Sequence, residues 1–423
     1  MDPEIKAFVA ALERRLTAED LASLDACIDC QYCAESCTWF LSSYDPALRP
    51  TFKSHFIADL FHRFLTLQGK LRGGIGLAHR YTAQDLREHM DAYWKCSTCG
   101  LCTLSCPAGI DMSRIVRAAR AAYVEAGLAA ENPALQAIAE RVEHRLGVDA
   151  ASDDAARFAL GWTEQGVDVP VAVRGAEGLL LLPASLPDCG TKLLRVLSAA
   201  GVSYTVSPRA VDSDAEIDEV VVDRALSKRL FENWEAEAAW LGCAELLALD
   251  APTLARDAAE MLGRPFALPL VDVDELLLRL IESGRLAVEP GGERVTLHDP
   301  CHTPHRAGDT ARALLAHVAS DVVEMRPNRE HSYCCGGGAG GLSLPENAEL
   351  RRRASSFKAA QIRATGARFV VTSRAVCARA LDDAGVAHGL AAPGERVSRL
   401  LFELVHDAML RALAHRAAGS AGG

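Results

Sequence analysis

The chain carries two runs of four cysteines with the same spacing, and these runs constrain its fold more than any other feature. The first run is Cys27-x2-Cys30-x2-Cys33-x3-Cys37, and the second is Cys96-x2-Cys99-x2-Cys102-x3-Cys106-Pro107. Where two runs of this spacing hold two [4Fe–4S] clusters, three thiolates of a run ligate one cluster and the fourth ligates the other. We therefore expect one cluster on Cys27, Cys30, Cys33 and Cys106, and a second on Cys96, Cys99, Cys102 and Cys37.

Zinc is the alternative metal for cysteine-rich runs. Zinc sites typically use two separated Cys-x2–4-Cys pairs, rather than a row of four cysteines that occurs twice. The first run lacks the trailing proline of the second, since Thr38 follows Cys37, but this difference removes no ligand. The spacing therefore favours iron–sulfur clusters over zinc.

The cysteine content and the charge indicate where such a chain works. It has 14 cysteines in 423 residues and a net charge of −11, and its first residues, Met1-Asp2-Pro3-Glu4, lack the pattern of an export signal. Cysteines in such a chain serve metal or redox chemistry rather than disulfides, which indicates a cytoplasmic location, with peripheral membrane association through a larger complex left open. Apolar runs such as Leu179–Leu182 are far shorter than a transmembrane helix, and no basic run indicates nucleic-acid binding.

Helical and strand-like patterns divide the chain at about residue 177. Residues 1–150 show helical spacing of apolar residues, as in Ile5–Leu16 and His55–Leu67, with a loop predicted at Leu71–Gly76. Residues 151–176 form a predicted linker, and 416–423 a predicted disordered tail. Between them, short apolar runs alternate with helical patterns, which predicts an α/β domain with mostly parallel strands. The runs are Gly178–Leu182, Glu219–Val222, Val295–Leu297 and Phe369–Val371.

The α/β half contains an internal repeat. Residues Val220–Leu230 resemble Val370–Leu381, each interpreted as a strand that leads into a helix, and Ser227 stands where Cys377 stands. The repeat predicts a duplicated domain with a first lobe at 177–290 and a second at 291–415. The first lobe would have lost its metal ligands. Cys189 and Cys243 are interpreted as small buried hydrophobic residues.

Four further cysteines form a set in the second lobe. Cys301 ends the sequence His298-Asp299-Pro300-Cys301, Cys334 and Cys335 precede a glycine-rich stretch to Gly341, and Cys377 follows a predicted strand. The glycines would let backbone N–H groups approach cluster sulfurs. A phosphate site is the alternative, but the stretch lacks the P-loop and dinucleotide spacings. Nearby histidines are expected to hydrogen-bond to the cluster or cap a helix rather than to ligate it: His298, His302, His305 and His331.

Together these motifs resemble the D subunit of heterodisulfide reductase, and are similar to the iron–sulfur subunits of glycolate oxidase and anaerobic glycerol-3-phosphate dehydrogenase. The resemblance implies an α + α/β fold, in which a helical two-cluster ferredoxin domain precedes a duplicated α/β cysteine-rich (CCG) domain. In that family each lobe ideally carries a Cys, then Cys-Cys-Gly, then Cys-x2-Cys. Here Arg374 replaces one cysteine of the second lobe, and Asp212-Ser213-Asp214 stands near the place of the first lobe's pair. The resemblance thus implies a single third cluster, on Cys301, Cys334, Cys335 and Cys377.

The expected function is electron transfer within a larger oxidoreductase, rather than turnover by this chain alone. Clusters carry one electron and flavins two, so the expected partner is a flavin-containing dehydrogenase or an electron-transfer flavoprotein subunit. A quinone-linked or further iron–sulfur subunit is the expected second acceptor. Two alternatives stay open: a catalytic heterodisulfide or thiol reductase that uses the C-terminal cluster, and a non-redox scaffold subunit that holds zinc or no metal. No catalytic residue is assigned.

Overall fold

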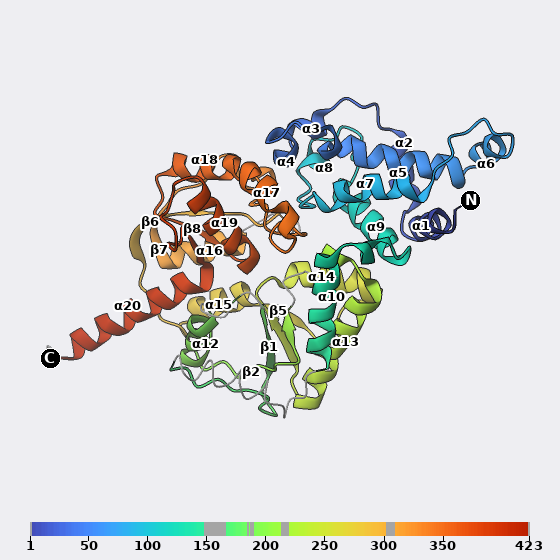
Figure 1. The fold of residues 1–423 in the computed structure, drawn as a ribbon. Helices are drawn as coiled ribbons and strands as arrows, with labels where there is room; N and C mark the ends of the chain where they lie inside the picture. The colour runs from blue at the N-terminus through green and yellow to red at the C-terminus, as the bar shows by residue number, and fades with distance from the viewer. Residues whose placement is uncertain are drawn as a thin grey trace. The chain divides into compact units, whose positions relative to one another are not determined.

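The computed structural model divides the chain into two compact units (Figure 1). It describes residues 2–147, 166–183, 186, 190–212, 220–301 and 309–421. The first unit comprises Met1–Glu140 with two later segments, Ala215–Arg224 and Tyr333–Phe357. The second unit comprises Arg141–Asp214, Ala225–Ser332 and Lys358–Gly423. Cys189, His302 and His305 lie outside the described residues.

The first unit is built from helices, and its described residues contain no strand. Apolar residues at helical spacing cause this: Ile5, Phe8 and Leu12 of the first helix are all buried. The Phe8 ring contacts Tyr123, whose hydroxyl donates to Leu86 O at 2.8 Å and so joins three helices. The helices are α1 Pro3–Glu13, α2 Ala18–Asp25, α3 Tyr32–Glu35, α4 Thr38–Leu41, α5 Pro50–Phe64, α6 Leu67–Gly74, α7 Ala83–Trp94, α8 Leu101–Leu104, α9 Met112–Glu125 and, from the later segment, α17 Ala348–Ala354.

Helix α6 differs from the prediction for this stretch. The glycines of Leu71–Gly76 predict a loop, but the structure continues a helix from Leu67 to Gly74. Thr66 caps the helix by accepting a hydrogen bond from Gly69 N at 3.1 Å. The helix forms because Gly69 and Gly73, which have no Cβ, lie against the end of α5.

The second unit contains two sheets of parallel strands, so the chain as a whole combines helices with parallel sheets (Figure 1). The first sheet has the order β2-β1-β4-β5, with β3 also paired to β1, and the second has the order β7-β6-β8-β9. The strands are β1 Gly178–Pro183, β2 Tyr204–Thr205, β3 Val211–Asp212, β4 Glu245–Ala248, β5 Leu270–Asp272, β6 Gly291–Leu297, β7 Ala319–Val322, β8 Phe369–Thr372 and β9 Ser398–Leu400.

Helices connect these parallel strands, as parallel pairing requires. The helices are α12 Gly190–Ala199, α13 Arg224–Leu241, α14 Ala251–Leu262, α15 Val273–Glu282, α16 Asp309–Val318, α18 Ser356–Thr365, α19 Ala375–Ala387 and α20 Leu401–Ala421, with α10 Pro133–Leu146 preceding the first sheet. Within the unit, α12 packs against α20 and α15 against α16, around buried residues such as Leu193, Leu277 and Phe402. Since α20 reaches Ala421, residues 416–421 are helical where a disordered tail is predicted.

The two sheets have the same strand order and the same register at their ends. The last paired residues are Ala248 with Asp272 in the first sheet, and Thr372 with Leu400 in the second. In each sheet, one helix begins three residues after the end of the third strand in this order, β4 or β8. Another helix begins directly after the fourth strand, β5 or β9. This places Asp250 at the position of Arg374, and Thr253 at the position of Cys377.

The register corrects the sequence repeat. Residues Val220–Val222 are not a strand, so they do not correspond to β8; the counterpart of β8 is β4. Ser227 therefore does not stand where Cys377 stands. The physical reason lies in the first unit, where Val220 O accepts a hydrogen bond from Trp94 Nε1 at 2.9 Å instead of pairing in a sheet. A run of three valines predicts a strand on propensity, and this tertiary contact overrides it.

Candidate metal centres

The two cysteine runs share an unusual backbone geometry. In the first run Asp29 and Gln31 have positive φ angles of 53° and 67°, and the equivalent Thr98 and Gly100 have 47° and 74°. Positive φ disfavours residues with a Cβ, and such strain concentrates at functional sites. Each pair of left-handed residues flanks the second cysteine of its run and turns the chain there. The short helices α3 and α8 then begin directly after Gln31 and Gly100.

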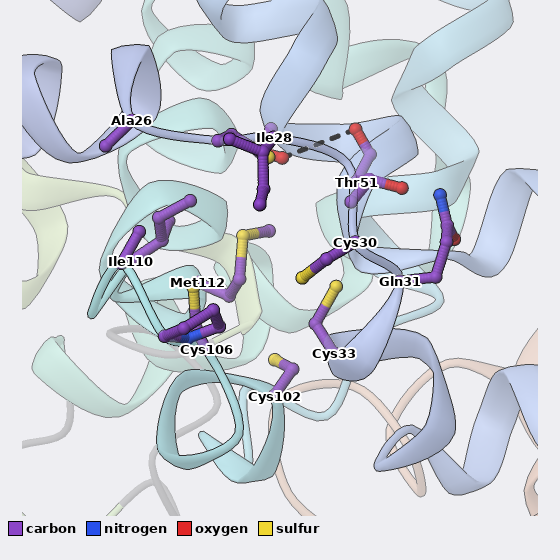
Figure 2. Close-up of a pocket in the computed structure, with 14 residues that line it drawn as sticks. Ala26, Ile28, Cys30, Gln31, Cys33, Thr51, Cys102, Cys106, Ile110 and Met112 are labelled. Atoms are coloured by element: carbon purple, nitrogen blue, oxygen red, sulfur yellow. Dashed lines mark hydrogen bonds between the residues drawn. The ribbon is translucent and has the colours of Figure 1, made fainter.

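The first cavity gathers cysteines from both runs (Figure 2). It has a volume of about 220 Å³, and its walls include Cys27, Cys30 and Cys33 of the first run and Cys106 of the second. In Figure 2 the sulfur atoms of Cys30 and Cys33 lie next to each other, and Cys102 and Cys106 line the same cavity. Burial raises the pKa of Cys33 to about 11, and the neighbouring Cys106, Cys27 and Cys30 thiols add to the rise. The remaining walls are mostly apolar, with Ile28, Ile110 and Met112.

The second cavity gathers the complementary set. Its walls include Cys96, Cys99 and Cys102 of the second run together with Cys37 of the first, around a volume of about 30 Å³. Burial raises the pKa of Cys37 to about 11; Lys53 opposes this rise, while Cys96 and Cys99 add to it. The pKa of Cys102, which lines both cavities, lies well above the usual thiol value through burial and the thiols of Cys99, Cys96 and Cys37.

These donor sets fit iron–sulfur clusters. The 13 cysteines that the structure describes are all free thiols, so none of them is committed to a disulfide. Four thiols that meet in a buried space raise one another's pKa because their thiolates repel, and a bound cationic centre removes this penalty. When bound there, a [4Fe–4S] cluster accepts and releases single electrons. The residues themselves would supply the thiolates, and the mostly apolar walls and the nearby charges would form the surroundings of a bound cluster.

Two buried cations lie beside the second cysteine set. The Lys53 side chain, 3% exposed, lines the second cavity and donates to Leu48 O at 3.0 Å. The Arg120 guanidinium is fully buried and donates to Tyr93 O at 2.8 Å and Cys96 O at 2.7 Å. Sequence reasoning missed both residues, because nothing in the sequence near Lys53 or Arg120 marks them as neighbours of a cysteine run.

A histidine lies beside the first set. His55 of α5 has its Nε2 atom 3.4 Å from Cys27 Sγ, within hydrogen-bonding distance for sulfur. His55 is 28 residues from Cys27 in the sequence. Its position on an amphipathic helix predicted no contact with a cysteine. A hydrogen bond to a ligating sulfur would tune the potential of a bound cluster.

The four C-terminal cysteines are divided between the units. Cys334 and Cys335 belong to the first unit, and Cys301 and Cys377 to the second. Gly336 N donates to Cys334 Sγ at 3.2 Å, the backbone approach that the following glycines predict. Gly341 is required in this loop, because a Cβ atom there would lie 1.7 Å from Gly336 O. The loop thus holds two buried thiols against a close-packed backbone.

Within the first unit, this glycine-rich loop is anchored to the second cysteine run. The Asn347 side-chain amide, fully buried, donates to Trp94 O and to Gly340 O, both at 3.0 Å. Trp94 is two residues from Cys96. Helix α17 also packs on α4, where Leu350 and Ala354 join a buried cluster with Trp39, Leu48 and, at its edge, Cys37. Sequence reasoning missed Asn347 and Trp94, since the contact joins residues far apart in the chain.

In the second unit, the structure brings His298 to Cys377. His298 follows the last residue of β6, and its N–H donates to Val371 O of β8 at 2.8 Å. A ring nitrogen of His298 lies within 4.8 Å of Cys377 Sγ, and both side chains are buried. His331, by contrast, is exposed. Cys243 is buried, as its interpretation as a small hydrophobic residue predicts.

Arg374 forms an ion pair with its structural counterpart in the other sheet. Its Nε lies 2.7 Å from Asp250 Oδ2, with the two side chains 8% and 14% exposed. Asp250 follows β4 as Arg374 follows β8. The position where the resemblance expects a cysteine is therefore occupied by one half of a buried ion pair.

Comparison with known families matches both groups of cysteines. A family model described as "4Fe-4S dicluster domain" matches residues 23–110, and one described as "Cysteine-rich domain" matches residues 295–382. The first match spans both ferredoxin-type cysteine runs, and the second spans Cys301, Cys334, Cys335 and Cys377. The chain thus carries a match to each of these two domains, and it resembles the D subunit of heterodisulfide reductase and Hdr-like iron–sulfur subunits.

Curated relatives match most of the chain. The D subunit of the dihydromethanophenazine:CoB–CoM heterodisulfide reductase of Methanosarcina barkeri is 25% identical over 77% of this chain and 81% of the relative. An Hdr-like menaquinol oxidoreductase iron-sulfur subunit of Archaeoglobus profundus is 23% identical over 78% of this chain and 69% of its own length. An EtfAB:quinone oxidoreductase of Syntrophomonas wolfei is 24% identical over 86% of this chain and 56% of its own length.

The relatives support an iron–sulfur electron-transfer role for the chain, as a subunit of a larger oxidoreductase. Among the helices that the structure describes, none combines the length and the apolar character needed to cross a membrane.

Proposed function

We propose that this chain relays electrons between a flavoprotein partner and a second acceptor. One observation carries the proposal: two cavities in the first unit each gather cysteines from both runs. Cys27, Cys30, Cys33 and Cys106 line the first, Cys96, Cys99 and Cys37 line the second, and Cys102 lines both. Two adjacent one-electron centres suit a relay, since a flavin partner releases its two electrons one at a time.

We assign the ligands accordingly. The first cluster is held by Cys27, Cys30, Cys33 and Cys106, and the second by Cys96, Cys99, Cys102 and Cys37. The walls of the two cavities and the thiols that raise the pKa values of Cys33 and Cys37 support this crossed assignment. The first unit contributes all eight ligands.

The proposal also includes a third cluster, on Cys301, Cys334, Cys335 and Cys377. It rests on the match to the cysteine-rich domain, which includes all four residues, and on the free thiols of the set. The proximity of His298 to Cys377 makes His298 a neighbour of this centre in the second unit. Asn347 anchors the Cys334–Cys335 loop to the second cysteine run, which suits electron exchange between the second and third centres.

We also propose that the α/β part arose by duplication, and that its first lobe lost its ligands. The two sheets share strand order and end register, and the helices pack reciprocally, α12 on α20 and α16 on α15. At the positions of Arg374 and Cys377 the first lobe carries Asp250 and Thr253, neither of which suits an iron–sulfur cluster. A paired catalytic site with a cluster in each lobe is therefore not supported, and relay is favoured over disulfide reduction.

The partners follow from the relatives' names and the chemistry. An electron-transfer flavoprotein or a flavin-containing dehydrogenase is the proposed donor or acceptor on one side, as the name of the EtfAB:quinone oxidoreductase suggests. A quinone-linked or further iron–sulfur subunit is proposed on the other, in line with the menaquinol oxidoreductase subunit. The abundance of free thiols suits a reducing compartment such as the cytoplasm.

The test is anaerobic purification of the full chain, followed by metal analysis and redox assays. We expect iron with equal sulfide, reduction by dithionite, reoxidation by a dye, and no turnover of disulfides or hydroxy acids until a flavin subunit is added. Zinc in place of iron would establish the scaffold alternative. Disulfide reduction by the isolated, flavin-free chain at about 1 s⁻¹ or faster would overturn the relay and make the C-terminal set an active site.

A further inference from the structure

Helix α6 and the residues after it display an apolar surface, which we call the α6 stripe: Leu67, Leu71, Ile75 and Leu77. These side chains are 74%, 63%, 71% and 67% exposed. Figure 1 shows α6 beyond the C-terminal end of α5, at the outer end of the first unit. We propose that the α6 stripe inserts into the surface of a membrane that contains anionic lipid. This inference is independent of the proposed relay.

The stripe is held outward by the packing of the helix. Gly69 and Gly73 lie against the end of α5, where a Cβ on Gly69 would lie 1.8 Å from His62 O and one on Gly73 2.2 Å from Arg63 Nη1. At about 100° per residue, Leu67 and Leu71 lie on the side of the helix opposite these glycines. The glycine face must therefore face α5, which leaves the leucine face in solvent.

Arg63 fixes this arrangement. Its Nη1 donates to Gly69 O at 3.1 Å and its Nε to His79 O at 3.2 Å, so one guanidinium ties α5 to both ends of the α6 segment. The exposed leucines therefore belong to a hairpin of α5 and α6 that these hydrogen bonds hold in place. An exposed apolar surface on such a fixed element indicates a binding site.

The charge around the stripe identifies its partner. No acidic residue occurs between Asp59 and Asp85, whereas this interval contains four cations, Arg63, Lys70, Arg72 and Arg80, in a chain whose net charge is −11. Apolar side chains flanked by Lys and Arg bind anionic bilayers, because the cations meet the lipid headgroups while the apolar groups enter the acyl boundary. Protein interfaces favour aromatic anchors, and the stripe consists of leucine and isoleucine alone. A lipid surface is therefore the better fit.

The test measures co-sedimentation of the cluster-loaded full chain with lipid vesicles under anaerobic conditions. One set of vesicles is phosphatidylcholine alone, and the other contains roughly one third phosphatidylglycerol. We expect binding to the anionic vesicles that weakens as salt is raised. The double variant Leu67→Glu/Leu71→Glu should weaken binding at least about tenfold, and Lys70→Glu/Arg72→Glu should remove the preference for anionic lipid.

Matched controls separate the stripe from apolar exposure in general. Leu410 and Leu413 of α20 are also exposed, so Leu410→Glu/Leu413→Glu should leave vesicle binding unchanged. Iron content and circular dichroism check that the variants are folded; if the leucine variant fails this check, the Lys70/Arg72 variant decides. The proposal is overturned if the wild-type chain does not co-sediment with anionic vesicles, or if a folded stripe variant binds them as tightly as the wild type does. Stripe-dependent binding to an acidic protein, without vesicle binding, would assign the stripe to a protein partner instead.

Discussion

At the scale of single residues, charge distinguishes the two cysteine sets of the first unit. Lys53 lines the second cavity and Arg120 donates to Cys96 O, whereas His55 is the polar neighbour of Cys27 in the first. A buried positive charge stabilises the reduced, more negative state of a cluster and raises its potential. We therefore infer that an electron is more stable at the second set than at the first.

Replacing Lys53 by Met tests the effect of this charge. The potential of the second cluster should fall by about 50 to 100 mV, since removing one nearby cation costs the reduced state roughly 1 to 2 kcal/mol. Lys53→Arg, which keeps the charge, should stay near the wild-type value. An anaerobic redox titration followed by EPR measures both. An equal shift of both clusters, or the same shift in the arginine variant, would contradict the assignment.

The crossed ligation gives a second prediction at this scale. Cys37→Ser should leave the same residual EPR spectrum as Cys99→Ser, because both remove a thiolate from the second cavity. Cys106→Ser should instead match Cys30→Ser. Cys243→Ser, at a buried cysteine outside both sets, is the control and should leave the spectrum unchanged. If Cys37→Ser matched Cys30→Ser, each run would ligate its own cluster.

At the scale of elements, carboxylates gather where the strands of the first sheet end and their helices begin. Asp272 caps α15 by accepting hydrogen bonds from Asp274 N and Glu275 N, and it also accepts one from Ala251 N of α14. Burial raises the pKa of Asp272 to about 7, and the nearby Asp250 carboxylate adds to the rise. Burial also raises the pKa of Asp274. The helix starts are therefore most stable when Asp272 is protonated.

Asp272→Asn should keep an acceptor oxygen for the cap of α15 and remove the buried charge, with loss of the hydrogen bond from Ala251 N. A raised carboxyl pKa means that the folded state binds the proton more tightly, so the free energy of unfolding falls as pH rises from about 4 to about 7. The variant should therefore gain roughly 1 to 2 kcal/mol over the wild type at pH 8 and little at pH 4. Urea unfolding at the two pH values measures this, and a variant that is less stable at pH 8 would refute it.

At the scale of the whole molecule, the chain joins a helical part that carries two cysteine runs to a cysteine-rich α/β part. The segment Tyr333–Phe357 belongs to the cysteine-rich domain by family match and to the first unit by its packing. Cys334 and Cys335 are thereby held in the same compact unit as the eight ferredoxin-type cysteines. This arrangement suits a chain whose centres exchange electrons with one another.

The double variant Cys334→Ser/Cys335→Ser tests the third centre within the full chain. It should lose about four irons and keep the EPR signals of the first two clusters, because their eight ligands are untouched. Cys243→Ser, at a buried cysteine outside the set, is the control and should keep the full iron content. An unchanged iron count in the cysteine variant would show that these cysteines bind no cluster.

The sequence by itself determined the two cysteine runs, because ligand spacing along the chain is a local property. It predicted the helical first part and the parallel strands, and its crossed assignment of the eight cysteines to two clusters stays a prediction. Tertiary structure alone decided the rest. The valines at 220–222 predict a strand but contact Trp94 instead, and strand register, not sequence similarity, aligned Thr253 with Cys377. The sequence did not predict the contacts of Lys53, Arg120 and Asn347 or the Asp250–Arg374 ion pair. Burial and charge around a site arise from residues that only the fold brings together.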